Sequence, residues 1–214
     1  MTWDLRGVRR AVVVAPHPDD EVIGAAALIR HLRRQGGDVR VIVVSDGAAS
    51  HPNSMAWPRQ RLVAARERES LHALRRLGVV RGQVTFLRLP DGGLSAGCRS
   101  ALHRALRRYP AIDLIVGPAI GDAHPDHRAV ADALRDYAFA GRRLTYRVWP
   151  PERPMAARGA SVTMPGGAAA KRSLIRVHRT QLGAITDDPH GFAIARHELA
   201  VFAHPVERFA TVTR

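Results

Sequence analysis

The chain alternates short apolar runs with longer segments in which apolar residues recur at helical spacing. Continuous apolar runs, typical of strands buried on both faces, predict strands at residues 11–15, 39–45, 84–89, 112–117 and 144–149. Helical spacing, closed in places by glycine, predicts helices at residues 20–35, 59–77, 95–108 and 125–140. This alternation with short connections indicates an α/β fold, a Rossmann-like three-layer sandwich with a mostly parallel central sheet.

The pattern weakens after the proline-rich break at residues 150–154. A strand at residues 161–164 and a helix at residues 168–182 are expected, whereas the segment 199–213 is assigned no element. No internal repeat, low-complexity tract or long linker divides the sequence. A chain of 214 residues that is 46% hydrophobic can bury a proper core. We therefore expect one domain over residues 1–214.

The composition excludes several classes of protein. Apolar residues are spread throughout and 24% of residues are charged, which excludes wholesale disorder. Cys98 is the one cysteine, so an internal disulfide framework and a cysteine-based zinc finger are excluded as well. No apolar run approaches the roughly 18 residues that a membrane span needs, and the first ten residues do not resemble a signal peptide. A soluble cytoplasmic protein is the expectation.

The formal net charge of +14 has two interpretations. Of the 33 basic residues only Lys171 is a lysine, and the arginines are scattered along segments with helical spacing. Such a charge is compatible with a nucleic-acid partner or an acidic substrate. No arm or tail concentrates the arginines, however, so solvated helix faces and a codon bias toward arginine explain the charge more simply.

Two polar clusters directly follow predicted buried strands. The first is Pro16-His17-Pro18-Asp19-Asp20-Glu21, and the second is Asp122-Ala123-His124-Pro125-Asp126-His127. In sheets of this kind, functional sites gather at the carboxyl ends of the strands. An aspartate at a strand–helix junction can serve simply as a helix N-cap. Two His-Pro-Asp clusters at two strand ends favour a functional site over capping alone.

Imidazole and carboxylate are the ligands expected for a catalytic zinc that keeps an open position for water. His17 and Asp20 are three residues apart across a proline-stiffened turn, and His127 in a second helix start can supply a third ligand. Asp19 and His124 are then near the metal but not needed to hold it. This set suits hydrolysis, with a lowered pKa of a metal-bound water, a carboxylate base and a histidine acid. Two histidines and one carboxylate also accept ferrous iron, so Fe²⁺ stays open beside Zn²⁺.

The residues of these clusters resemble those of the PIG-L/LmbE-like deacetylases. The family motifs are matched by the sequences APHPDDE at 15–21 and HPDH at 124–127. Further likeness is found in the R-x-x-E helix at 66–69, the L-P-D-G turn at 89–92 and the late H-x-T-Q segment at 178–181, where threonine replaces the usual serine. The resemblance implies a zinc-dependent enzyme that removes N-acetyl groups from N-acetylglucosamine-type amino sugars.

The resemblance also implies roles for individual residues. The implied zinc ligands are His17, Asp20 and His127. Asp19 would be the general base that activates the metal-bound water. His124, as an imidazolium, would stabilise the oxyanion and protonate the departing amine, and Asp126 would orient His124 and favour its protonated form. The alternative for Asp126 is a first-turn carboxylate that favours the helix N-terminus.

Three further residues are candidate substrate contacts. Arg66 and Asp91 resemble family residues that would bind sugar hydroxyls, although a solvated helix face and a turn-forming role are their plainer interpretations. Asp46 either lines the pocket or makes an Asp-Gly turn. The roles of His51 and His178 stay open.

Several alternatives remain at this point. The same metal site can cleave another amide, an ester or a phosphoester, and a basic nucleic-acid-binding domain with a relict site is a third hypothesis, which predicts steep salt dependence of polyanion binding. The basic surface mildly favours a substrate whose sugar is attached to an anionic carrier. The expected partner is a small-molecule amino sugar, with no specific nucleic acid.

Overall fold

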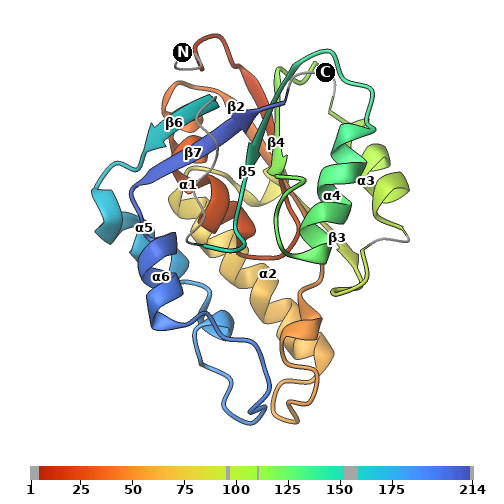
Figure 1. Ribbon diagram of the computed structural model, residues 1–214, viewed down its shortest axis with the longest axis vertical. Coiled ribbons are helices and arrows are strands. Elements are labelled where there is room, and N and C mark those ends of the chain that lie inside the picture. The colour runs from red at the N-terminus through yellow and green to blue at the C-terminus, as the bar shows by residue number, and fades with distance from the viewer. Residues whose placement is uncertain (1–4, 95–96, 110, 152–158, 213–214) are drawn as a thin grey trace.

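In the computed structural model, which describes residues 5–94, 97–109, 111–151 and 159–212, a seven-stranded sheet forms the middle layer (Figure 1). Its strands are β1 (Arg10–Ala15), β2 (Asp38–Ser45), β3 (Val84–Leu89), β4 (Leu114–Pro118), β5 (Arg142–Tyr146), β6 (Gly159–Thr163) and β7 (Val206–Thr211). They are arranged in the order β3-β2-β1-β4-β5-β7-β6. The first five strands are parallel, as predicted, and β7 pairs antiparallel with both β5 and β6.

Helices cover both faces of the sheet. They are α1 (Asp20–Arg34), α2 (Arg59–Arg76), α3 (Cys98–Leu106), α4 (Pro125–Arg135), α5 (Gly167–Ile175) and α6 (Arg196–Phe202), with short 3₁₀ turns η1 (Ala48–Ser50), η2 (Arg81–Gln83) and η3 (Arg179–Gln181). In Figure 1, α3 and α4 lie together on one face, while α1, α2 and α5 lie on the other. Two apolar cores result, one on each face of the sheet, which confirms the three-layer prediction. None of the helices in the described ranges is both long and apolar enough to cross a membrane.

Several predicted elements end earlier than the apolar pattern indicates, and after one of them a side chain captures the backbone amides. The predicted strand 144–149 ends at Tyr146, since the amides of Val148 and Trp149 donate instead to Asp122 Oδ2. The predicted helix 168–182 ends at Ile175, and the backbone then forms η3. The predicted helix 125–140 is also shorter, ending at Arg135.

Helix α1 is interrupted near its start, and a residue from the last strand repairs the interruption. Ala25 has φ −144° and ψ 15°, which is not helical. The amides of Ala27 and Leu28 donate instead to the carboxylate of Glu207 on β7, at 2.9 and 3.2 Å. Glu207 is buried and also accepts from Lys171 Nζ at 2.8 Å. The second part of α1 therefore has its N-terminal cap on a distant strand.

Gly24 allows α1 to lie directly against β5. A Cβ atom at this position would lie 2.3 Å from Cδ2 of Tyr146, whose buried hydroxyl donates to Val14 O at 2.8 Å. We expect Gly24→Ala to lower the free energy of unfolding by about 1–3 kcal/mol, because the overpacking exceeds the gain in helix propensity. Urea unfolding measures this. Gly82→Ala, with no heavy atom within 4 Å of the new Cβ, is the matched control and should not destabilise the protein. An equally stable Gly24→Ala protein would contradict the expectation.

Candidate active site

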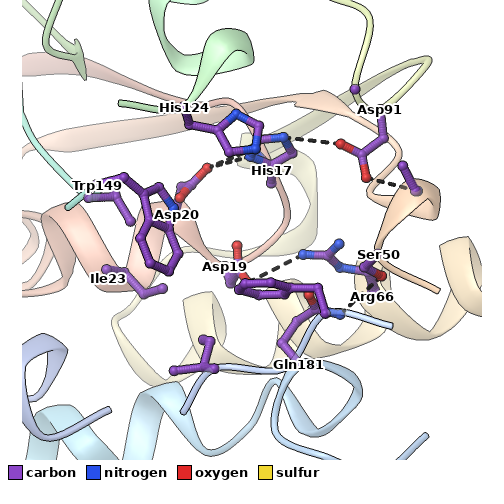
Figure 2. A pocket seen from close by; sticks show the side chains of 15 residues that line it. His17, Asp19, Asp20, Ile23, Ser50, Arg66, Asp91, His124, Trp149 and Gln181 are labelled. Carbon is purple, nitrogen blue, oxygen red and sulfur yellow. Dashed lines mark hydrogen bonds and ion pairs between the residues drawn. The ribbon is translucent and has the colours of Figure 1, made fainter. Parts of the chain in front are cut away.

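The candidate site lies where the strand order reverses, between β1 and β4. The chain leaves β1 into residues 16–19 and α1, and leaves β4 into residues 119–124 and α4. Because β1 and β4 are parallel neighbours, both loops emerge at the same edge of the sheet, which is the usual ligand site of this architecture. Figure 2 shows His17 and Asp20 from the first loop beside His124 from the second. Both predicted clusters therefore meet in one pocket of about 230 Å³.

Three donor atoms form a nearly equilateral triangle. His17 Nδ1 lies 3.1 Å from Asp20 Oδ2 and 3.2 Å from His127 Nε2, and the last two atoms are 3.1 Å apart. Three ligands about 2.1 Å from one tetrahedral ion lie about 3.4 Å apart, so the spacing suits a metal centre. His17 also belongs to two further groups of potential metal ligands. One group is His17, His124 and His127, and the other is His17, Asp91 and Asp126.

Carboxylates lie behind both histidines of the triangle. Asp122 Oδ2 is 3.2 Å from His127 Nδ1, while Asp91 Oδ1 and Asp126 Oδ2 lie 3.1 and 3.3 Å from His17 Nε2. Metal-binding histidines commonly donate their second ring N–H to a carboxylate, which fixes the tautomer and the ring orientation. Histidines that were close together by chance would not be expected to have carboxylates beside their second ring nitrogens. The residues present therefore fit a divalent cation of the zinc type.

Asp19 is held beside the triangle in a strained backbone conformation. Its φ is 147°, a region that residues with a side chain rarely adopt. Glu21 Oε2 accepts the Asp19 amide at 3.0 Å, and the buried Arg66 lies 3.3 Å from Asp19 Oδ2. Burial and the charge of Asp20 raise the pKa of Asp19 to about 7, against the opposing effect of Arg66. A carboxylate with this pKa suits a general base at neutral pH.

Arg66 is buried and does not belong to a solvated helix face. Its guanidinium donates to Gly47 O at 2.7 Å and to Pro18 O at 2.9 Å as well as facing Asp19. Gly47 has φ 68°, and a Cβ there would collide with the guanidinium. The solvated-face interpretation of Arg66 is therefore wrong, and its side chain lines the pocket beside Asp19, as Figure 2 shows.

The geometry around His124 and Asp126 differs from the sequence expectation. The Asp126 carboxylate accepts from the amides of Gly92 and Leu94 and approaches His17, because α4 directs it toward the turn after β3. His124 Nδ1 instead accepts from the Asp126 amide at 3.2 Å, which leaves Nε2 to carry the ring proton. Burial and the neighbouring His17 lower the pKa of His124. The structure thus favours a neutral imidazole over the expected imidazolium.

Other candidates lie at different distances from the pocket. Asp91 lines it, while Asp46 is buried outside the lining, where its carboxylate accepts from the Ala48 amide and pairs with Arg59. The turn-forming interpretation of Asp46 therefore fits the structure better. His51 is buried with its ring against Gly191, and His178 is buried, which lowers its pKa to about 3. Neither ring is among the pocket-lining side chains.

The sequence analysis gave no role to several residues that line the pocket. They include Trp149, Gln181, Phe192 and Ile194. Gln181 is brought in by Glu69 of α2, which accepts from the Thr180 amide at 3.1 Å and from its hydroxyl at 2.6 Å. The R-x-x-E and H-x-T-Q motifs are therefore parts of one contact. The presence of both motifs in the sequence could therefore have indicated Gln181 as a pocket residue. No motif indicates the apolar residues of the lining.

Asp122 is the first residue of the second polar cluster, and the sequence pattern predicts no role for it. It is almost completely buried, and its Oδ1 accepts from the His124 amide at 3.0 Å. Its Oδ2 accepts from the amides of Val148 and Trp149 and lies beside His127. One carboxylate therefore connects both histidines of the second motif to the chain that follows β5.

Comparison with known proteins gives a family and several relatives. The model of the family described as PIG-L, GlcNAc-PI de-N-acetylase, matches residues 12–138. A 1D-myo-inositol 2-acetamido-2-deoxy-alpha-D-glucopyranoside deacetylase of Mycolicibacterium paratuberculosis is 31% identical over 144 residues, covering 55% of this chain and 47% of the relative. The chain thus aligns with about half the length of the curated relatives it matches.

Solved structures share the fold at low sequence identity. The N,N'-diacetylchitobiose deacetylase of Pyrococcus horikoshii superposes with a TM-score of 0.77 at 21% identity, covering 98% of this chain and 87% of that one. The 4-carboxy-2-hydroxymuconate hydratase GalB of Pseudomonas putida superposes with a TM-score of 0.70 at 16% identity, covering 96% and 97%. Since a hydratase and a deacetylase share this architecture, the fold alone does not determine the reaction.

Proposed function

Because the chain belongs to the PIG-L family of GlcNAc-PI de-N-acetylases, we propose that it is a metal-dependent hydrolase acting on an N-acetylated amino sugar. The reaction adds water across the acetamide C–N bond and gives acetate and a free amine. The substrate class is an N-acetylglucosamine-type sugar or its conjugate. The observation that carries the proposal is the donor triangle of His17, Asp20 and His127 with Asp19 held beside it.

His17, Asp20 and His127 are the residues that would hold the metal. A divalent cation bound there supplies Lewis-acid chemistry for the water and for the acetyl oxygen. Zn²⁺ is the proposed metal, and Fe²⁺ is compatible with the same two-histidine, one-carboxylate set. Asp20 stays ionised in this setting: although burial opposes ionisation, His127 and His17 hold its pKa well below the usual range.

The other residues of the pocket carry out proton transfer, stabilisation of the acetyl oxygen and substrate binding. Asp19 accepts the proton of the attacking water, and Arg66 fixes the direction of its carboxylate. His124, with its proton on Nε2, donates a hydrogen bond to the acetyl oxygen as that oxygen gains charge. Protonated Asp19 then returns the proton to the departing amine. Asp91, which lines the pocket, is placed to accept hydrogen bonds from sugar hydroxyls in addition to its contact with His17.

The amine-release assay tests this function. The purified protein is stripped with a chelator, reloaded with Zn²⁺ or anaerobically with Fe²⁺, and supplied with N-acetylglucosamine and its methyl glycoside. We expect equimolar amine and acetate, loss of both in the stripped protein, and recovery with metal. Parallel assays with acetyl esters and phosphoesters of simple sugars address the other scissile bonds. Cleavage of those bonds with no amine from any acetamide would reject the deacetylase proposal while retaining a hydrolytic metal site.

Two expectations stay outside this test. The cytoplasmic location remains a prediction. The nucleic-acid hypothesis has little support, because the five central positions His17, Asp19, Asp20, His124 and His127 lie together with chemically competent side chains. A relict site would not require that arrangement.

A further inference from the structure

The pocket has a polar half and an apolar half. The polar half contains the catalytic groups together with Ser50, Asp91 and Gln181. The apolar half is formed by Ile23, Val148, Trp149, Phe192 and Ile194. In Figure 2, Trp149 and Ile23 lie on the side of the pocket away from Asp91. A substrate that places its acetamide beside Asp19 therefore has an apolar wall next to another part of its structure.

Trp149 is fixed before any substrate arrives. Its amide donates to the buried Asp122, and its ring makes an edge contact with Phe202 of α6, with centroids 5.4 Å apart at 89°. A second edge contact, at 6.0 Å and 81°, joins it to Phe192. Edge-to-face packing of this kind holds aromatic rings in defined orientations.

The backbone of Phe192 is also held in place, while the residue remains partly open to solvent. Its amide donates to Ser50 O at 2.7 Å, and the preceding Gly191 lies so close to His51 that a Cβ there would approach the ring to 2.2 Å. The Phe192 side chain is nonetheless 40% exposed. A partly exposed apolar side chain that lines a pocket and packs against Trp149 offers a contact surface for a ligand.

The charges of the pocket do not suit a phosphate-bearing substrate. Arg66 is the one arginine or lysine among the described residues that line it, and its guanidinium already serves Gly47 O, Pro18 O and Asp19. Three carboxylates, those of Asp19, Asp20 and Asp91, face the same space. The positive charge of the chain is therefore placed away from the pocket lining. This reverses the mild preference for an anionic carrier that the net charge suggested.

We propose that the substrate is an acetamido sugar bearing an uncharged, apolar substituent, aromatic or alkyl, which packs on Trp149 and Phe192. The inference rests on the proposed deacetylation and names the class of molecule attached to the sugar. Trp149 and Phe192 are thus specificity-determining residues. They distinguish apolar conjugates from sugar phosphates and from unsubstituted sugars.

The test compares three matched substrates: the methyl glycoside, the benzyl glycoside and the 1-phosphate of N-acetylglucosamine. We expect kcat/KM for the benzyl glycoside to exceed the other two by about tenfold, the scale on which one apolar group changes discrimination. Trp149→Ala and Phe192→Ala should each reduce this preference severalfold. Val80→Ala is the control and should retain the full preference. Val80 is an exposed apolar residue that precedes η2 and β3, and it therefore lies near the amino end of β3, whereas the pocket lies at the carboxyl ends of the strands. Equal rates, or the fastest reaction with the phosphate, would overturn the inference.

Calorimetric binding to the Asp19→Asn protein keeps the inference separate from the proposed reaction. Tighter binding of the benzyl than of the methyl glycoside, diminished by a second substitution of Trp149, supports the apolar subsite even if no substrate is deacetylated. Absence of amine from all three substrates would count against the proposed function alone. Equal binding of the two glycosides, or no binding of the benzyl glycoside, would overturn the inference even if both are deacetylated.

Discussion

Asp19→Asn is expected to lower kcat for acetamide hydrolysis by about 10²–10⁴-fold, the usual contribution of a general base. The amide has nearly the size of the carboxylate but cannot accept the proton of water. Asparagine also tolerates positive φ better than most residues, so the strained backbone of position 19 is retained. The measurement is amine release with metal content determined on the same samples. We expect unchanged metal content, because Asp19 is not a member of the donor triangle.

Asp132→Asn is a suitable control for this substitution. Asp132 is a partly exposed carboxylate on α4 that pairs with Arg135, outside the pocket lining. Its loss should leave kcat within twofold of the unaltered protein. An Asp19→Asn protein with full metal content and nearly full kcat would exclude Asp19 as the base.

Asp122→Asn is expected to weaken metal binding by about 10–100-fold, the cost commonly seen when the carboxylate behind a ligating histidine is lost. The asparagine oxygen, in the position of Oδ2, can still accept from the Val148 and Trp149 amides, whereas the His124 amide loses the acceptor that it has in Oδ1. The asparagine no longer provides the negative charge beside His127 Nδ1. Competition between the protein and a chromophoric chelator gives the metal dissociation constant directly.

Asp188→Asn provides the comparison for Asp122. Asp188 is also a buried carboxylate that accepts from backbone amides, those of Asn53 and His190, but it does not contact the donor triangle. Its substitution should leave the dissociation constant unchanged. Equal affinities of the unaltered and Asp122→Asn proteins would show that His127 is oriented by its packing alone.

The central part of the fold could be predicted because its signals are local. The residues of β1 and β2 are apolar on both faces, and each run is followed by a turn and a helix start, so sequence alone places them in a covered parallel sheet. The antiparallel β7 was not assigned, because its pattern is mixed and its pairing with β5 spans few residues. The end of β5 at Tyr146 depends on Asp122, which lies in the loop after β4.

Some residues of the candidate site could likewise be predicted from sequence, and others could not. His17, Asp20 and His127 could be brought together from sequence, because the two motifs directly follow strands that become neighbours. The hydrogen-bond partners of Asp126 could not be predicted, because its carboxylate reaches across to the turn after β3 and accepts from the amides of Gly92 and Leu94. Phe192 could not be predicted for a similar reason: it lies far along the chain, and the contacts that place it leave no periodic pattern. These are its own contact with Ser50 and that of Gly191 with His51.

The cap on α1 has a consequence for the way the protein is made. The acceptor for the Ala27 amide lies 180 residues later, on Glu207. A ribosome releases the first helix long before it has synthesised β7, so the nascent chain carries these amides without their native partner while the intervening residues are made. The helix that begins with Asp20 therefore reaches its final hydrogen bonding only when the last strand docks. A ribosome stalled before residue 207 therefore holds a chain in which that helix still lacks part of its final hydrogen bonding.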